Sequence, residues 1–123
     1  MKKIIKVGIM PKEEYKKRTI AIAKGEYKPK KDEPKIWFES IKSMSQVLSH
    51  ENQELLKIII ENHPKSLKEL ADVSGRKPSN LSRTLKTMSS YGIVELKKEK
   101  EVRPVVKVTD FQVEFGLHYS FCC

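Results

Sequence analysis

SLKELADVSGRKPSNLSRTLKTMSSYGIVELKKEKEVRPVVKV, residues 66–108, is the stretch of sequence that decides the fold. Its first part predicts two short helices joined by a tight turn. Ser66 followed three residues later by Glu69 is typical of a capping box at a helix start. Gly75 predicts a helix stop in the left-handed region, which glycine adopts without a Cβ clash, and Pro78 predicts the first turn of a second helix. The predicted buried faces consist of Leu67, Leu70, Ala71 and Val73 on the first helix and Leu81, Leu85 and Met88 on the second.

The second helix leaves a short, polar and cationic face turned outward, formed by Ser79, Asn80, Arg83, Thr84 and Thr87. Such a face suits a helix that lies in the major groove of DNA. Tyr91-Gly92 then predicts a second helix stop. Two strands follow, residues 93–96 and 102–108, around the charged loop 97–101. The order of these parts favours a winged helix-turn-helix over two packed helices with a glycine turn, which any helical domain can contain.

The net charge of +9 is concentrated in two parts of the chain. Residues 1–35 contain twelve Lys or Arg against five acidic residues, and residues 65–109 contain eleven against five. The stretches 36–64 and 110–123 are slightly acidic. This distribution favours binding of a polyanion through phosphate contacts and counterion release. For residues 1–35 alone, a basic surface that merely keeps the protein soluble explains the charge equally well.

The rest of the chain predicts an α+β protein that is mainly helical. A strand is expected over residues 3–10, then a helix opened by Pro11 and stopped by Gly25, then an extended linker over residues 28–34. The helix carries a thin apolar stripe of Tyr15, Thr19, Ile22 and Ala23. An amphipathic helix is expected from Ile36 to Leu48. Ser49 then caps a further helix, whose predicted core residues are Leu55, Leu56, Ile58, Ile59 and Ile60, and Pro64 ends it.

We divide the chain into a basic N-terminal arm, residues 1–35, a winged helix-turn-helix domain, residues 36–109, and a C-terminal strand and tail, residues 110–123. In the last part, Phe111, Val113, Phe115 and Leu117 alternate with polar residues, which predicts a strand with one apolar face. Such a strand must pair, and the N-terminal strand is the obvious candidate. We predict a homodimer with both termini in its interface, which would double the phosphate contacts. Pairing within one chain is the alternative.

The sequence offers no pattern for catalysis, a cofactor or a metal, so we expect no enzyme activity and no cofactor. His50, His63 and His118 lack metal-ligand spacing, and no phosphate loop, nucleophile elbow or HExxH pattern occurs. Cys122 and Cys123 are adjacent and poorly placed to bridge each other, so we expect a reduced tail. No stretch approaches the ~18 apolar residues that span a bilayer, and a signal peptide is not expected, so we expect a cytoplasmic protein.

Two stretches, RTIAIAKGE at residues 18–26 and EPKIWFES at residues 33–40, resemble a group of MarR-like winged-helix proteins of bacteria and archaea. Val47-Leu48-Ser49 and Leu55-Leu56 add to the resemblance, which covers residues 15–117. These proteins are described as predicted transcriptional regulators, so the resemblance implies DNA binding. Members of the group look like partners of small toxin-like proteins encoded beside them. The resemblance therefore also implies an antitoxin that represses its own operon.

Our hypothesis for the function is a sequence-specific, dimeric repressor that binds double-stranded DNA without a cofactor. Asn80 paired with adenine and Arg83 with guanine would each contribute about 1–3 kcal/mol of discrimination. Ser79, Thr84 and Thr87 would face base edges or nearby phosphates. The expected phosphate contacts are Ser82 and Lys86 beside the buried stripe, Arg76 and Lys77 at the turn, and Lys97, Lys98, Lys100 and Arg103 in the wing. Because Glu99 and Glu101 weaken the positive electrostatic field of the wing, we expect only some of its cations to contribute to phosphate binding.

The alternative is a protein-interaction module, since winged helices also serve as docking surfaces. The apolar residues between Phe111 and Phe121 would then bind a partner such as a toxin. DNA binding and partner docking are compatible with each other. DNA binding would use the second helix of the helix-turn-helix, and docking would use the terminal strands. RNA binding is a weaker third hypothesis, because the aromatic residues of a stacking platform are missing.

Overall fold

A computed structural model describes residues 2–117 of the chain. These residues form five helices and five strands, in the α+β class that the sequence predicts. They fall into two compact units. Of the described residues, one unit comprises Gln46–Thr109 with Lys2 and Lys3, and the other comprises Ile4–Ser45 and residues 110–117. His118, Phe121, Cys122 and Cys123, on which expectations were placed above, lie outside the described residues.

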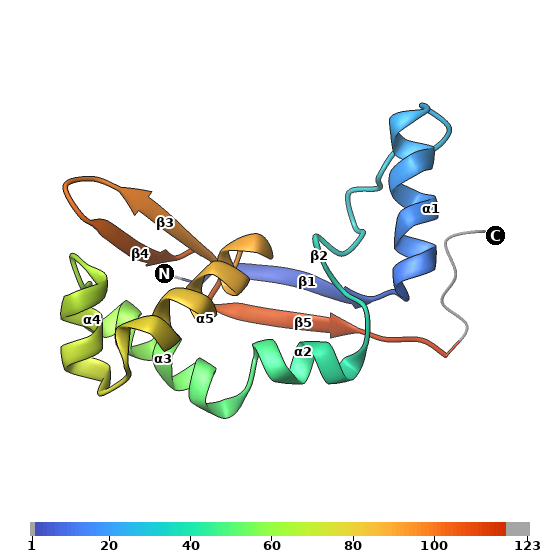
Figure 1. The fold of residues 1–123 in the computed structure, drawn as a ribbon. Coiled ribbons are helices and arrows are strands. Elements are labelled where there is room, and N and C mark those ends of the chain that lie inside the picture. The colour runs from blue at the N-terminus through green and yellow to red at the C-terminus, as the bar shows by residue number, and fades with distance from the viewer. Residues whose placement is uncertain (1, 118–123) are drawn as a thin grey trace. The chain divides into compact units, whose positions relative to one another are not determined.

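The second unit is built on a three-stranded parallel sheet. β1 (Ile4–Ile9) is its central strand, and it pairs with β2 (Ile36–Phe38) on one side and β5 (Asp110–Glu114) on the other. Figure 1 shows β5 running alongside β1 over its length. The predicted strand pairing is therefore satisfied within one chain, the alternative stated above. The terminal strands give no reason to invoke a second copy, and the homodimer remains a prediction.

The sequence-based helix from Ile36 onward is wrong for its first residues. Ile36–Phe38 is strand β2, and the helix, α2 (Ile41–Val47), begins only after Ser40, whose Oγ accepts the amide of Ser43 at 3.0 Å. β-Branched and aromatic side chains suit a strand that pairs with β1, and this long-range pairing outweighs the helical period. β2 thus lies with the N-terminal strand, whereas the sequence-based division assigned residues 36–38 to the DNA-binding domain.

Gly8 lies where β1 passes under the side chain of Trp37. A Cβ atom at this position would lie 2.5 Å from Cζ3 of Trp37 and 2.9 Å from Cγ of Pro34. Real Cβ atoms essentially never come this close to other atoms, so any other residue would force Trp37 or Pro34 to shift, and the close approach of the two strands favours glycine. Val7, Ile9, Ile36 and Phe38 around it are buried and form the core of this unit.

Helix α1 (Lys12–Ala23) follows Pro11 and stops before Gly25, as predicted, but its buried residue is unexpected. Tyr15 of the predicted apolar stripe is 43% exposed, whereas Arg18 is only 9% exposed. The Arg18 guanidinium forms an ion pair with Oε1 of Glu33 at 3.0 Å and lies 5.3 Å from the Trp37 ring centroid. Such a buried, stacked ion pair joins α1 to the loop that leads into β2.

Glu33 receives hydrogen bonds on both carboxylate oxygens. The Tyr27 hydroxyl donates to its Oε2 at 2.6 Å, the Lys30 amide donates to the same oxygen at 2.7 Å, and Arg18 Nε donates to Oε1 at 3.0 Å. Burial disfavours the charged form, but these donors and the Arg18 charge favour it more strongly. Together they hold the pKa of Glu33 below its ordinary value.

Replacing Glu33 by glutamine should lower the free energy of unfolding by about 1–3 kcal/mol at neutral pH, because the charge-assisted bonds are lost. The folded-state pKa is lowered, so the contribution is present above the ordinary glutamate pKa and is lost as the pH falls through the folded-state value. Urea denaturation of both proteins between pH 7 and pH 3 measures the difference, which should shrink with acidity. Exposed Glu26 provides the control variant Glu26→Gln, and an equal effect there would refute the assignment.

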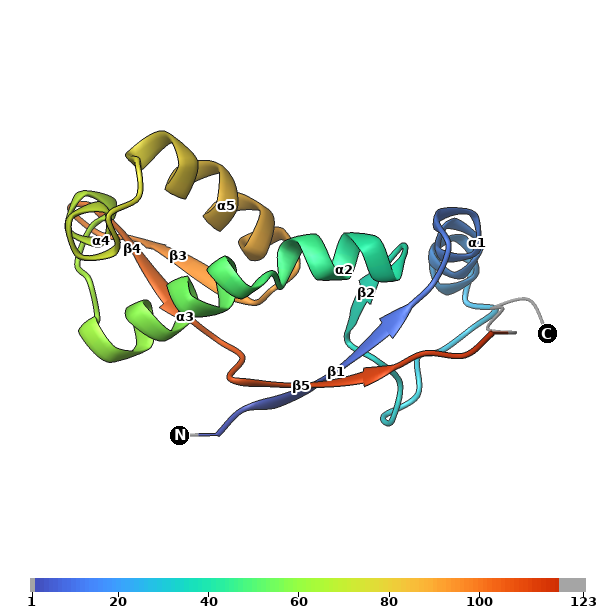
Figure 2. The ribbon, with the colours of Figure 1, turned by 90° about the horizontal axis from the view of Figure 1, so that it is seen from below.

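The first unit consists of three helices and a hairpin. α3 (His50–Asn62), α4 (Leu67–Ser74) and α5 (Pro78–Ser90) are followed by β3 (Val94–Lys98) and β4 (Val102–Val106), which pair in antiparallel. Figure 2 shows the hairpin strands between α5 and α3. The core of the unit is formed by Leu55, Leu56, Ile59, Leu70, Leu81, Leu85, Met88, Ile93, Val94 and Val108.

The helices of this unit begin and end at the capping, glycine and proline residues that the sequence predicts. Ser66 Oγ accepts the Glu69 amide at 3.0 Å, which confirms the N-cap half of the predicted capping box. Ser49 caps α3, Gly75 ends α4 at φ 74°, and Pro78 opens α5. Val73 and Ile60, by contrast, are 48% and 41% exposed, although both were predicted to be buried. No helix within residues 2–117 is both long and apolar enough to cross a lipid bilayer.

Candidate nucleic-acid interface

The outward face of α5 is fixed by the residues on its other side. Leu81, Leu85 and Met88 are fully buried, so the helix cannot rotate without exposing them. Of the residues predicted to face outward, Ser79, Asn80, Arg83 and Thr87 are exposed and Thr84 is half-buried; of their neighbours, Lys86 is exposed and Ser82 is half-buried. The structure thus brings all the predicted residues of α5 onto one side of the helix or its flanks.

Two hydroxyl groups of this helix point back to the backbone. Thr87 Oγ1 donates to the Arg83 carbonyl at 3.1 Å, and Ser90 Oγ donates to the Thr87 carbonyl at 2.6 Å. Thr87 therefore retains only acceptor capacity for a ligand in this arrangement. Asn80 and Arg83 are exposed, and neither side chain forms a hydrogen bond to another described residue.

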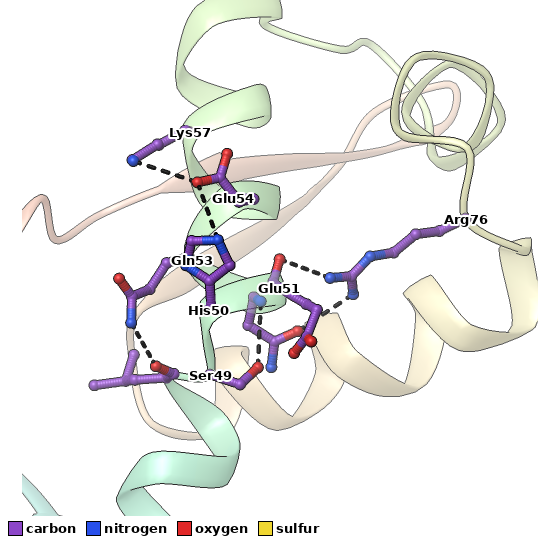
Figure 3. Close-up of polar contacts among 9 residues, drawn as sticks. Ser49, His50, Glu51, Gln53, Glu54, Lys57 and Arg76 are labelled. Carbon is purple, nitrogen blue, oxygen red and sulfur yellow. Dashed lines mark hydrogen bonds and ion pairs between the residues drawn. The ribbon is translucent and has the colours of Figure 1, made fainter.

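Arg76 bridges the turn between α4 and α5 to the start of α3. Its Nη2 donates to the Glu51 carbonyl at 2.7 Å, and its Nη1 donates to Oδ1 of Asn52 at 3.2 Å. Figure 3 shows the Arg76 side chain extended from the turn toward Glu51. Sequence reasoning placed Arg76 on the DNA backbone and missed this bridge, which joins residues 24 and 25 positions apart.

The start of α3 is itself well ordered by hydrogen bonds. Ser49 Oγ accepts the Asn52 amide, and the Asn52 side chain donates to the Val47 carbonyl at 3.0 Å. An open depression beside the first turn of α5 is lined by Ser49, Glu51, Asn52, Arg76, Lys77, Asn80 and Thr84. The bridge therefore holds the start of α3 and the start of α5 in one fixed arrangement, with Lys77 exposed at its rim.

The hairpin carries its cations in two different states. Arg103 pairs with Glu99 at 3.3 Å, and Lys107 pairs with Glu95 at 3.7 Å. Lys97, Lys98 and Lys100 are exposed, and none of them forms an ion pair with a carboxylate in the described part of the chain. The sequence-based expectation that only some wing cations count thus gains a specific form, because Lys97, Lys98 and Lys100 have no described carboxylate partner, whereas Arg103 would have to exchange Glu99 for a ligand.

Between residues 2 and 117, no three histidine, cysteine, aspartate or glutamate side chains come together in a way that could hold a metal ion. The exposed cations of α5 and of the hairpin belong to the same unit of the chain.

The protein has a small α+β fold, and the polar face of α5 and the basic β3–β4 hairpin belong to the same unit. A family model named HVO_A0114 matches residues 47–113, which is more than half of the chain. The chain belongs to the HVO_A0114 family. The match begins after the stretches 18–26 and 33–40 that carry the MarR-like resemblance, so it does not bear on them. No curated protein and no solved structure gives a significant match.

The Arg76 bridge predicts different effects for two arginine substitutions only seven positions apart. Arg76→Ala should lower the free energy of unfolding by about 1–3 kcal/mol, because two hydrogen bonds from a charged group are lost. Arg83→Ala should change it by less than about 0.5 kcal/mol, because the side chain is exposed. Urea denaturation monitored by circular dichroism provides both values. Equal effects of the two substitutions would show that the bridge does not stabilise the fold.

Proposed function

We propose that the unit Gln46–Thr109 is a winged helix-turn-helix that binds double-stranded DNA sequence-specifically and regulates transcription. The observation that carries the proposal is the fixed outward face of α5, polar and cationic, in the same unit as a hairpin with three unpaired lysines. The helix order, the tight turn at Gly75 and the hairpin that follows α5 agree with this reading. A major groove accepts one helix, and phosphates accept the flanking cations.

Within this proposal α5 is the recognition helix. Asn80 and Arg83 extend from its exposed side and have the chemistry to bond adenine and guanine, respectively, in bidentate fashion. Ser79 and Thr84 contribute shorter polar contacts. Lys86 lies farther along the helix and binds phosphate, while Lys77 at the N-cap lies where a helix N-terminus favours an anion.

The hairpin acts as the wing. Lys97, Lys98 and Lys100 bind the sugar-phosphate backbone through charge, without reading the bases. Arg76 donates two hydrogen bonds within the protein, so its part is mainly to position the turn, and its direct contribution to phosphate binding is smaller than the charge count implies. Arg103 forms only an exposed ion pair with Glu99, which a phosphate can replace.

The regulatory role follows from the resemblance to MarR-like proteins rather than from the geometry. In this proposal the protein is a repressor of its own operon, a dimer on its operator, and an antitoxin if a toxin-like protein is encoded beside it. A second candidate function, docking of a protein partner, is favoured by one observation. Val113 within β5 and Phe115 just after it are 48% and 52% exposed, and β5 is an edge strand of its sheet among the described residues.

DNA binding predicts two distinct mutant phenotypes in a mobility-shift titration with the DNA upstream of the gene, run at two salt concentrations. Arg83→Ala should reduce the preference over unrelated competitor DNA, with a cost of about 1–3 kcal/mol. Lys98→Gln should weaken binding to all sequences alike and reduce the salt slope by about one. The reason is that one group reads bases and the other neutralises a phosphate.

The control for this titration is Lys57→Gln, which removes an exposed lysine of α3 outside the proposed interface. It should bind like the unaltered protein. If the unaltered protein shows no shift, or a shift that competitor DNA abolishes equally, specific DNA binding is refuted and the docking function gains weight. If Arg83→Ala keeps the full preference, α5 is not the recognition helix.

A further inference from the structure

A groove of about 390 Å³ lies within the unit Gln46–Thr109, between the last turn of α3 and the outer edge of β4. Its walls are aliphatic, formed by Ile59 and Ile60 of α3 and by the β4 residues Pro104, Val105 and Val106. The groove explains why Ile60, predicted to be core, is 41% exposed. Its volume falls within the range of small-molecule sites in proteins.

The edge of β4 that borders the groove cannot extend the sheet regularly. The Lys107 amide donates to the Ile93 carbonyl at 2.9 Å, so these two residues form a hydrogen-bonded pair. Because such pairs alternate along antiparallel strands, Leu96 and Pro104 form a non-hydrogen-bonded pair, and the backbone of Pro104 faces the open edge. Proline has no N–H to offer there. An added strand is therefore disfavoured, and a small molecule is the better occupant.

The ionisable side chains around the groove are all basic. Lys3, His63, Arg103 and Lys107 line it, and no carboxylate is among the described residues that do so. The backbone of Lys3 is fixed by hydrogen bonds to Thr109. Its amide donates to Thr109 Oγ1 at 2.7 Å, and its carbonyl accepts a hydrogen bond from the Thr109 amide. The partners of Arg103 and Lys107 are exposed glutamates, and exposed ion pairs contribute little. Both cations can therefore turn to a ligand at small cost.

His63 ends α3 in a strained backbone conformation beside the groove. Its φ of 47° and ψ of 56° lie in the left-handed region, and it is the one non-glycine residue of the described chain with a positive φ. Glycine would adopt this conformation more easily. A strained residue that lines a site is consistent with a role for its side chain, and the imidazole can donate a hydrogen bond there.

The geometry points to a binding site for a small organic anion with an apolar body and a single carboxylate. The body lies against Ile60 and Val105, and the carboxylate accepts hydrogen bonds from the Arg103 guanidinium and the Lys107 ammonium group. Arginine suits this role because its planar fork matches a carboxylate. The site does not depend on the proposed DNA binding, so either assignment can fail alone.

Octanoate is a suitable probe, because it combines an aliphatic body with a carboxylate. Titration of the 15N-labelled full chain should produce saturable chemical-shift changes at the amides of Ile60, Val105 and Lys107. Octanol, which lacks the charge, should bind about ten-fold or more weakly, in line with the loss of charge-assisted hydrogen bonds. Acetate, which lacks the apolar body, should cause no saturable change. Equal binding of octanol and octanoate, or the absence of saturable changes at these amides, would overturn the proposal.

Three variants separate binding from folding. The double substitution Arg103→Gln with Lys107→Gln should weaken octanoate about ten-fold or more, and Ile60→Glu, at a partly exposed position, should do the same by placing a negative charge in the groove. Lys68→Gln removes an exposed lysine of α4 outside the groove and should leave the affinity unchanged. Unaltered affinity in both groove variants, whose folding the same spectra report, would overturn the assignment.

His63→Gly tests whether this histidine acts as a ligand or only ends a helix. A purely structural role predicts unchanged octanoate affinity and an equal or higher free energy of unfolding, because glycine relieves the backbone strain. A binding role predicts weaker octanoate binding together with that same equal or higher stability. Unchanged affinity removes His63 from the site.

Discussion

The burial of Leu81, Leu85 and Met88 is the constraint on which the rest of this structure depends. All three side chains are fully removed from solvent, and a cavity left by any one of them would cost several kcal/mol. This stripe sets the rotation of α5, so it also decides which residues face outward. Because α5 packs against β3, the same stripe anchors the hairpin beside it. The candidate interface is in this sense a consequence of core packing.

Sequence reasoning succeeds where the signal is local. Ser66, Gly75 and Pro78 act through their own backbone or that of close neighbours, so a short window contains all the information needed to place α4 and α5. It fails where the partner is distant along the chain. In the sequence, Arg18 resembles the neighbouring lysines of a basic, exposed helix. Its partners Glu33 and Trp37 lie beyond a loop, so the sequence gives no sign that Arg18 is buried.

β2 shows the same limit for secondary structure. Ile36–Phe38 reads as the start of an amphipathic helix by period, and only the neighbouring strand β1 makes it a strand. Likewise, alternation along residues 109–117 predicts a strand but not its partner, so the sequence leaves pairing within one chain open as the alternative to the predicted pairing across a dimer. The parallel register with β1 depends on residues more than a hundred positions away. Such long-range pairings carry little sequence signature.

The structure changes the sequence-based interpretation most for charge, because it shows which cations already have partners within the protein. Residues 65–109 carry a clear excess of cations, and a count treats them alike. In the structure Arg76 is committed to α3, whereas Arg103 and Lys107 form exposed pairs that a ligand can replace. Lys97, Lys98 and Lys100 have no competing partner among the described residues. Under the proposed DNA binding, a polyanion therefore meets its strongest attraction at the hairpin lysines and at α5. Under the proposed small-anion site, a ligand carboxylate replaces Glu99 and Glu95 as the partner of Arg103 and Lys107 at small cost, because exposed ion pairs contribute little to stability.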